Sequence, residues 1–236
     1  MEDLLLHWFA EHRRDLPWRR TRDAYAILVS EVMLQQTQVS RVIPRYLEWI
    51  ARWPTAAALA AAPRDEVIRA WQGLGYNRRA VNLHRAAEIV AAEGWPDDLT
   101  VLPGVGEYTA SAVRRFAWDE DVLPRDTNVD RVLERTGVSF GPAAAEALMD
   151  LGREVCLARV PRCDVCPVAT VCPSRGRRYP PLRKQSRFEG SFRQRRAETL
   201  RLVAAGRTAD LDAEAVASLE RDGLVELRAG AVRLPQ

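Results

Sequence analysis

The four cysteines of the chain form its most distinctive chemical pattern. They follow one another as Cys-x6-Cys-x2-Cys-x5-Cys, at Cys156, Cys163, Cys166 and Cys172, and the sequence has no others. Thiolates at this density bind zinc or an iron–sulfur cluster. Structural zinc sites more often use two Cys-x2-Cys pairs, so the uneven spacing favours a [4Fe–4S] cluster over zinc. Disulfides are disfavoured because the chain is long enough to build its own core and opens without a secretory signal, which indicates a reducing compartment.

Glu31 is the most unusual carboxylate in the sequence. It lies in Tyr25–Leu34, a run that is apolar nearly all round, and such a helix should be buried. A buried carboxyl group needs a partner or a raised pKa, and a raised pKa would let it keep a proton near neutral pH and act as a general acid. The alternative is a structural glutamate that is paired with an arginine.

Asp126 opens the segment Asp-Thr-Asn-Val-Asp-Arg-Val. The simplest interpretation of an isolated Asp at such a place is a helix N-cap. A second carboxylate facing Glu31 would have another use, because an acid and an anionic partner together can break an N-glycosidic bond through an oxocarbenium-like state, as glycosidases do.

A tight turn at the start of a helix is predicted at 102–110, in Leu-Pro-Gly-Val-Gly-Glu-Tyr-Thr-Ala. Gly104 and Gly106 allow the backbone to turn sharply and to approach a partner closely. The free N–H groups of the following helix would then point at an anion such as a DNA phosphate. The alternative is an ordinary turn between two helices.

Charge is unevenly distributed, although the formal net charge is only +3. The segment 175–201 has ten basic residues against Glu189 and Glu198, a balance that suits a phosphate backbone, although a solvated linker of biased composition would look the same. Its basic residues are Arg175, Arg177, Arg178, Arg183, Lys184, Arg187, Arg193, Arg195, Arg196 and Arg201. Lys184 is the only lysine of the chain, so a mechanism that needs a catalytic lysine must use it or is excluded.

The predicted elements make the first ~187 residues mostly helical. Pro and Gly mark short connections, and no apolar run is long enough for a membrane span. A linker is expected at 179–181, followed by a small module of two helices and a β-hairpin, which resembles a winged helix and is small enough to need docking on the main domain. The helices are expected at 4–12, 25–38, 42–53, 56–62, 64–74, 78–92, 108–117, 129–135, 143–156, 192–205 and 212–222, and the strands at 224–227 and 231–234.

Several of these motifs together resemble one family. Over residues ~8–173 the chain resembles the helix-hairpin-helix DNA glycosylases of the endonuclease III superfamily, and among them the MutY-type adenine DNA glycosylases. The matching stretches are Leu-Pro-Trp at 16–18, Ser-Glu-Val-Met-Leu-Gln-Gln-Thr-Gln at 30–38, Gly-Leu-Gly-Tyr at 73–76, 102–110, 126–132, Met-Asp-Leu-Gly at 149–152, and the four cysteines.

The resemblance implies a specific architecture: an all-α main domain with two lobes and a [4Fe–4S] cluster loop, followed by the winged-helix-like module. A six-helix barrel lobe with the helix-hairpin-helix would span 15–122. A cluster lobe would combine 1–14 with 123–187, and the module would occupy 188–236. The base-binding pocket would lie between the two lobes.

The resemblance also implies roles for individual residues. Glu31 would protonate N7 of adenine and later help to activate water, Asp126 would stabilise or covalently capture the sugar cation, and Tyr108 would support them. Gln36 and Tyr76 would enter the duplex as wedges while the base is flipped out. The cysteines would hold the cluster as a scaffold for a loop whose arginines, with Arg159 and Arg162, face DNA. Further DNA contacts are expected from Gly104, Gly106, Arg78, Arg175, Arg177 and Arg178.

Tyr108 bears on the reaction type, because bifunctional endonuclease III-like members carry a catalytic lysine at that position of the hairpin. The resemblance therefore implies a monofunctional, monomeric glycosylase that acts on adenine opposite 8-oxoguanine or guanine in double-stranded DNA, in the cytoplasm at the nucleoid. Two alternatives remain open: a glycosylase for thymine or uracil opposite guanine or for a deaminated purine, and a non-enzymatic iron–sulfur DNA-binding regulator.

Two departures from the family pattern concern the size of segments. The chain is about one helix shorter between Asn128 and Met149, which could reshape one wall of the base pocket. The C-terminal region is also too short for the β-rich domain with which MutY-type enzymes recognise 8-oxoguanine. Adenine excision is therefore better supported than a requirement for 8-oxoguanine.

Overall fold

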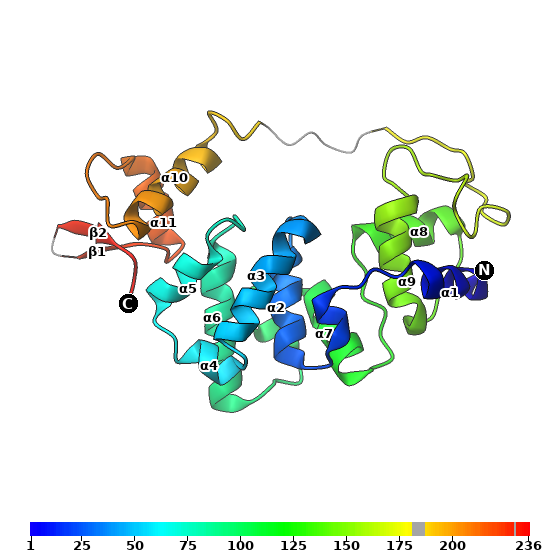
Figure 1. Ribbon diagram of the computed structural model, residues 1–236, viewed down its shortest axis with the longest axis horizontal. Helices are drawn as coiled ribbons and strands as arrows, with labels where there is room; N and C mark the ends of the chain where they lie inside the picture. The colour runs from blue at the N-terminus through cyan, green and yellow to red at the C-terminus, as the bar shows by residue number, and fades with distance from the viewer. Residues whose placement is uncertain (181–186, 229) are drawn as a thin grey trace. The chain divides into compact units, whose positions relative to one another are not determined.

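The computed structural model describes residues 1–180, 187–228 and 230–236. The backbone packs as two compact units (Figure 1). We call Met1–Ala24 with Glu107–Lys184 the cysteine unit, and Tyr25–Gly106 with Gln185–Gln236 the Glu31 unit. This division groups the C-terminal module with the segment that carries Glu31. The functional lobes expected at 15–122, at 1–14 with 123–187, and at 188–236 stay a prediction. Arg183 and Lys184 lie outside the described residues.

The main part of the Glu31 unit is helical, as predicted. Its helix α2 is apolar on almost every side and is buried along its length, while α3 and α5 contribute Trp49 and Trp71, whose rings meet edge to face with centroids 5.5 Å apart. The elements are α2 (Ala24–Leu34), α3 (Val39–Arg52), α4 (Ala56–Ala60), α5 (Arg64–Trp71), α6 (Arg78–Glu93) and a 3-10 turn (Leu99–Val101).

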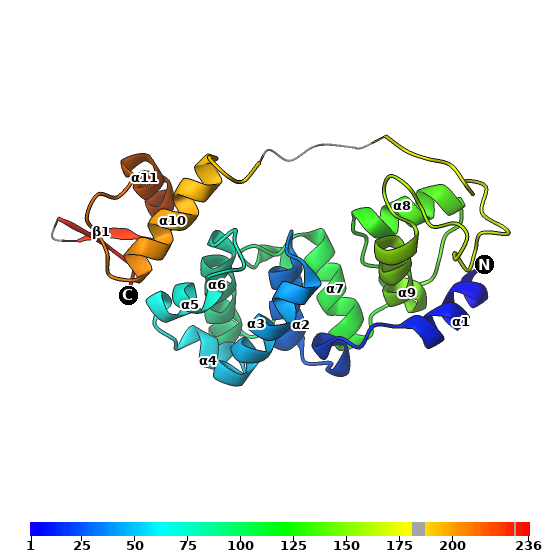
Figure 2. The ribbon, with the colours of Figure 1, turned by 45° about the horizontal axis from the view of Figure 1, so that its top comes forward.

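The cysteine unit packs α9 between α1 and α8 (Figures 1 and 2). Its core joins Leu5, Val132, Leu148 and Leu151, all of them almost fully buried. The helix predicted at 143–156 is divided: an α-helical part is followed by a π-helical turn that ends directly before Cys156. The elements are α1 (Glu2–His12), α7 (Glu107–Trp118), α8 (Thr127–Thr136), α9 (Ala145–Asp150), the π-helix (Leu151–Val155), and 3-10 turns at Pro17–Arg20 and Pro142–Ala144.

Asp150 anchors a buried ion-pair network in the cysteine unit. Its side chain is 1% exposed and accepts hydrogen bonds from Arg14 and from Arg19, whose Nη1 lies 2.8 Å from Oδ2. Burial alone would raise the pKa of Asp150, but the hydrogen bonds and charges of Arg19 and Arg14 together outweigh it and lower the pKa below 3.8. The ionised carboxylate therefore stabilises the folded state at neutral pH.

Replacing Asp150 with asparagine should destabilise the protein by about 3 kcal/mol at neutral pH, because two arginines lose their buried counter-charge. The folded-state pKa is depressed, so the stabilisation by Asp150 is complete above 3.8 and is lost as the pH falls through the folded-state pKa. Urea unfolding of the wild type and of Asp150→Asn at neutral and at acidic pH measures the difference in their free energies of unfolding. Asp130→Asn is the control, since Asp130 pairs with Arg125 at the surface. A difference that persists unchanged in acid would contradict the prediction.

The C-terminal module has the predicted order of elements, namely α10 (Phe192–Ala204), α11 (Ala213–Arg221) and an antiparallel hairpin of β1 (Glu226–Arg228) and β2 (Ala231–Arg233). Its apolar side chains, among them Leu200 and Leu219, share one core with Ile68 of α5 and Val81 of α6. The module therefore docks on α5 and α6 within the Glu31 unit, as expected from its small size. The winged-helix resemblance stays a prediction. No helix in the described ranges has the length and apolar character that a membrane span needs.

Candidate active site and cysteine centre

Glu31 lies in α2 of the Glu31 unit and is 7% exposed, so the predicted burial is confirmed. The burial follows from the sequence, because Ile27, Leu28 and Val32 around it are 2–3% exposed and give the helix no solvent-facing side. An apolar environment of this kind favours the protonated form of a carboxyl group, which is the form that a general acid needs.

Gln36 and Tyr76 both have left-handed backbones, with φ of 54° and 45°. The helix predicted at 25–38 ends at Leu34, and this boundary was wrong because the left-handed residue cannot continue a right-handed helix. Only a few per cent of non-glycine residues adopt positive φ, and such residues gather at functional sites. The Tyr76 side chain is also 45% exposed, which suits a group that enters a duplex.

The predicted glycine turn lies in the Glu31 unit, where the Val105 N–H donates to the Leu102 carbonyl across 3.1 Å. Gly104 has φ of +80°, and a Cβ there would lie 2.9 Å from Cβ of Asn82 in α6. Gly104 is therefore required both by its conformation and by close packing. A Cβ on Gly106 would meet only open space, so this glycine leaves the backbone accessible. The helix α7 begins at Glu107, and the half-buried Tyr108 lies in its first turn.

Asp126 is the N-cap of α8, so the simpler of its two interpretations is confirmed. Its Oδ1 accepts hydrogen bonds from the backbone N–H groups of Asn128 and Val129, both at 2.8 Å. The side-chain amide of Asn128 donates to Oδ2 across 2.7 Å. A cap and a catalytic role do not exclude each other, since these bonds fix the orientation of the carboxylate. Glu31 and Asp126 belong to different units, and their cooperation stays a proposal.

Arg131 connects the Asp126 region to Cys156, the first cysteine. No motif distinguished Arg131 from the many other arginines of the sequence. Its guanidinium donates to the Asn128 side-chain oxygen at 2.8 Å, to the Gly152 carbonyl at 2.6 Å and to the Cys156 carbonyl at 2.8 Å. A Cβ on Gly152 would lie 2.8 Å from the Asn128 carbonyl oxygen, so only glycine lets the π-helix pack so closely on α8. These contacts connect the N-cap region of Asp126, through Asn128, to the start of the segment 156–178, which we call the cysteine loop.

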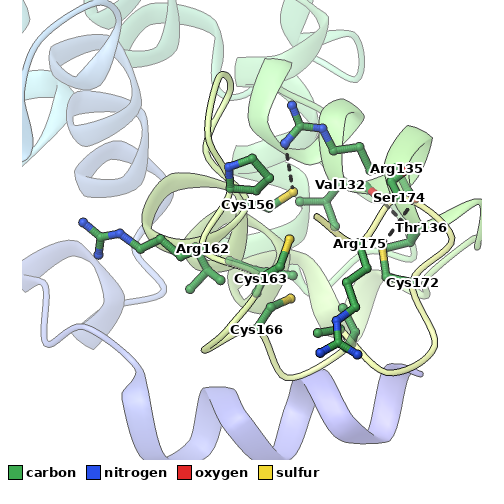
Figure 3. Close-up of a pocket in the computed structure, with 15 residues that line it drawn as sticks. Val132, Arg135, Thr136, Cys156, Arg162, Cys163, Cys166, Cys172, Ser174 and Arg175 are labelled. Carbon is green, nitrogen blue, oxygen red and sulfur yellow. Dashed lines mark hydrogen bonds between the residues drawn. The ribbon is translucent and has the colours of Figure 1, made fainter. Parts of the chain in front are cut away.

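The four cysteines line one pocket, and Figure 3 shows their sulfur atoms pointing toward the same space. Arg135 donates to Sγ of Cys156 at 3.4 Å, and the Gly176 N–H donates to Sγ of Cys163 at 3.3 Å. Donors around sulfur are a feature of iron–sulfur sites, where they tune the cluster. Burial raises the pKa of the Cys166 thiol to about 11. Without a metal, this thiol therefore keeps its proton at neutral pH, and it could act as a thiolate ligand only if a bound metal stabilised the negative charge.

The exposed arginines of the cysteine loop have no carboxylate partner within the described residues. These loop arginines are Arg159, Arg162, Arg175, Arg177 and Arg178.

The basic residues of the C-terminal module behave differently. Arg195 bonds to Asp212 and Glu214 at 2.8 and 2.7 Å, and Arg196 bonds to Asp222 at 2.5 Å. Arg78, expected to contact DNA, lies 3.6 Å from Asp222, although its side chain is 67% exposed. The segment 175–201 is therefore not one uniform basic surface.

Comparisons with known proteins agree with this geometry. The sequence model of the HhH-GPD superfamily base excision DNA repair proteins matches residues 29–156. The adenine DNA glycosylase of Mycolicibacterium smegmatis is 42% identical over a 268-residue alignment that covers 94% of this chain and 91% of the relative, so most of the C-terminal module lies within the match. The adenine DNA glycosylase of Homo sapiens is 38% identical over 212 residues, which are 73% of this chain and 39% of the relative.

Solved structures support the same fold. A thermostable thymine-DNA glycosylase superposes with a TM-score of 0.66 at 26% identity, covering 72% of this chain and 93% of that one. A trapped endonuclease III–DNA covalent intermediate superposes with a TM-score of 0.61 at 23% identity, covering 72% and 92%, and supports the fold alone. Fold, sequence model and relatives agree, and the chain belongs to the HhH-GPD superfamily of base excision DNA repair proteins, in its MutY-type branch.

Proposed function

We propose that the chain is a monofunctional DNA glycosylase that removes adenine mispaired with 8-oxoguanine or guanine. The observation that carries the choice of adenine is the 42% identity to a curated adenine DNA glycosylase over nearly the whole chain. The buried Glu31 agrees with it, because excision of adenine needs a proton donor for a purine nitrogen.

The proposed reaction is hydrolysis of the bond between C1′ of the sugar and N9 of adenine. Glu31 donates its proton to N7, and the bonding electrons leave with the base. The Asp126 carboxylate, oriented by its three hydrogen bonds, stabilises the positive charge that develops on the sugar. Water then adds to C1′ and gives its proton to the Glu31 carboxylate, which restores the acid. Tyr108 supports the carboxylates, and the products are free adenine and an abasic site.

Strand cleavage by this superfamily depends on a catalytic lysine at the hairpin position. In this sequence Tyr108 occupies that position, and the only lysine is Lys184. Without an amine at the sugar no Schiff base forms, and the strand is not cleaved by β-elimination. The abasic product should therefore stay intact until alkali is added.

A panel of duplexes with single lesions tests the substrate and the reaction type together. We expect base release from A:8-oxoguanine and A:G, none from T:G, U:G or deaminated purines, and strand breaks only after alkali treatment. The release of thymine but not adenine would favour the alternative function, a glycosylase for thymine or uracil opposite guanine. The structural similarity to a thymine-DNA glycosylase is consistent with that alternative. Nicking without alkali would contradict monofunctional action. Sequence-specific binding with no lesion processed would favour a regulator.

For the cysteine centre we propose a [4Fe–4S] cluster held by Cys156, Cys163, Cys166 and Cys172. The donor set fits, because four sulfurs surround one pocket and two of them accept hydrogen bonds. The choice of a cluster over a single zinc ion rests on the uneven spacing of the four cysteines. When bound, the cluster would hold the cysteine loop in place, so that the loop arginines face the phosphates of the duplex.

Anaerobically purified protein should contain about four irons and four acid-labile sulfides per chain, with broad visible absorbance. Cys163→Ser should lower the iron content, destabilise the cysteine unit and weaken DNA binding, because the loop loses a ligand. Ser174→Ala, a change at another residue of the same pocket, should keep the iron. One zinc per chain with no sulfide would rule out the cluster.

A further inference from the structure

Arg79, near the start of α6, is buried to 8% exposure and is surrounded by carbonyl oxygens. No carboxylate of the described residues pairs with it, and its charge is stabilised by hydrogen bonds and by the rings of Trp71 and Tyr76, whose centroids lie 5.2 and 5.7 Å from the guanidinium carbon. Burial lowers the pKa of Arg79 to about 10, which leaves it charged at neutral pH. Its guanidinium donates to the carbonyls of Val32 (2.7 Å), Met33 (3.1 Å), Gln35 (2.7 Å), Leu74 (3.3 Å), Gly75 (3.0 Å) and Tyr76 (3.3 Å) and to Oγ1 of Thr37 (3.1 Å).

These acceptors fall into two groups that are far apart in the sequence. The first group lies at the C-terminal end of α2, where the last carbonyls have no partner within the helix and attract a cation. The second lies in the turn before α6. The ring of Tyr76 is 5.7 Å from the guanidinium carbon, and the Trp71 indole N–H donates to the same turn, at the Gly75 carbonyl, across 3.1 Å. Arg79 thus ties the two turns to each other.

Each turn contains one residue whose backbone is left-handed, Gln36 in the first and Tyr76 in the second. A non-glycine residue pays about 1 kcal/mol or more for this conformation, so surrounding contacts must hold it. In the first turn, Arg79 donates hydrogen bonds to Gln35 and Thr37, the two neighbours of Gln36. In the second turn, it donates to the carbonyls of Gly75 and Tyr76. Arg79 is therefore placed to enforce both conformations at once.

We propose that Arg79 is the positioning residue that holds Gln36 and Tyr76 ready to open the duplex. The inference rests on the proposed function, in which these two side chains are the wedges. A wedge acts only if it is rigid, since it must offset the few kcal/mol that unstacking and unpairing cost. The competing interpretation is that Arg79 merely stabilises the fold.

Arg79→Met tests the inference by comparing two duplexes under single-turnover conditions. In one duplex the target A:8-oxoguanine pair has normal neighbours, and in the other a mismatched neighbour weakens stacking and makes flipping easier. We expect adenine release from the first duplex to fall about tenfold or more, since misplaced positioning groups cost on this scale. Release from the second duplex should fall far less. Arg85→Met, on the exposed side of the same helix, is the matched control and should leave both rates unchanged.

A double-mutant cycle separates positioning from general stability. Base flipping is measured with 2-aminopurine fluorescence. If Arg79 acts through both wedges, Arg79→Met should lower flipping less in the Tyr76→Ala background than in the wild type, because only Gln36 is left to be positioned. Thr37→Val removes a single Arg79 acceptor and should show the same preference for the weakened duplex, which keeps the test valid if Arg79→Met does not fold.

Equal losses on both duplexes, or additive effects in the cycle, would overturn the role of Arg79 while the proposed function stands. A wild-type chain that releases adenine from neither duplex would reject the proposed function itself, and the inference with it.

Discussion

Glu31→Gln should reduce adenine release by about 10²–10⁴-fold, because glutamine keeps the shape of the buried side chain but has no proton to give to the base. Binding to a duplex with A:8-oxoguanine should stay within a few-fold of wild type, since Glu31 lies inside α2 and 7% exposed. Single-turnover base release and fluorescence anisotropy measure the two properties separately.

Glu48→Gln is a suitable control for this experiment. Glu48 lies in α3 of the same unit, and its side chain is 66% exposed and paired with Arg45. The substitution Glu48→Gln should change neither adenine release nor binding to the duplex. A Glu31→Gln protein with full activity would show that Glu31 is a structural buried glutamate.

Asp126→Asn should lower the rate of base release by at least about a hundredfold, although the fold should hardly change. Asparagine is as good an N-cap as aspartate, so the α8 terminus keeps its hydrogen bonds while the negative charge near the sugar is lost. Asp126→Ala loses the cap as well and should cost about 1 kcal/mol of stability in addition. Single-turnover rates and thermal unfolding distinguish the two effects.

Asp212 offers a matched control, because it is the N-cap of α11 and bonds to the Ala215 N–H across 2.9 Å. Asp212→Asn should leave base release unchanged. If Asp126→Asn were as active as wild type, Asp126 would be a cap and nothing more.

Much of the fold was predictable because it depends on local patterns. The apolar circumference of α2 predicted both the helix and the burial of Glu31, and the cysteine spacing predicted four sulfurs around one pocket. Asp126 was correctly identified as a possible N-cap from its residue type alone. In each case the signal lies within a few residues of sequence.

The rest depends on partners that sequence spacing does not reveal. The end of α2 at Leu34 depends on Arg79, more than forty positions away, and on the left-handed backbone of Gln36. The π-helix before Cys156 depends on the close packing of Gly152 against Asn128. Nothing in the local sequence distinguishes Arg79 or Arg131 from the exposed arginines.

The ion pairs of α10 have a consequence for DNA affinity. A cation already bound to a carboxylate displaces few condensed counterions when it meets a phosphate, so Arg195 and Arg196 contribute little to the salt dependence of binding. The five loop arginines have no carboxylate partner in the described part of the chain. On the proposal that they face the duplex, we expect the affinity that is lost as salt rises to come mainly from the cysteine loop, and the affinity that remains in concentrated salt to come from the proposed wedges and base pocket.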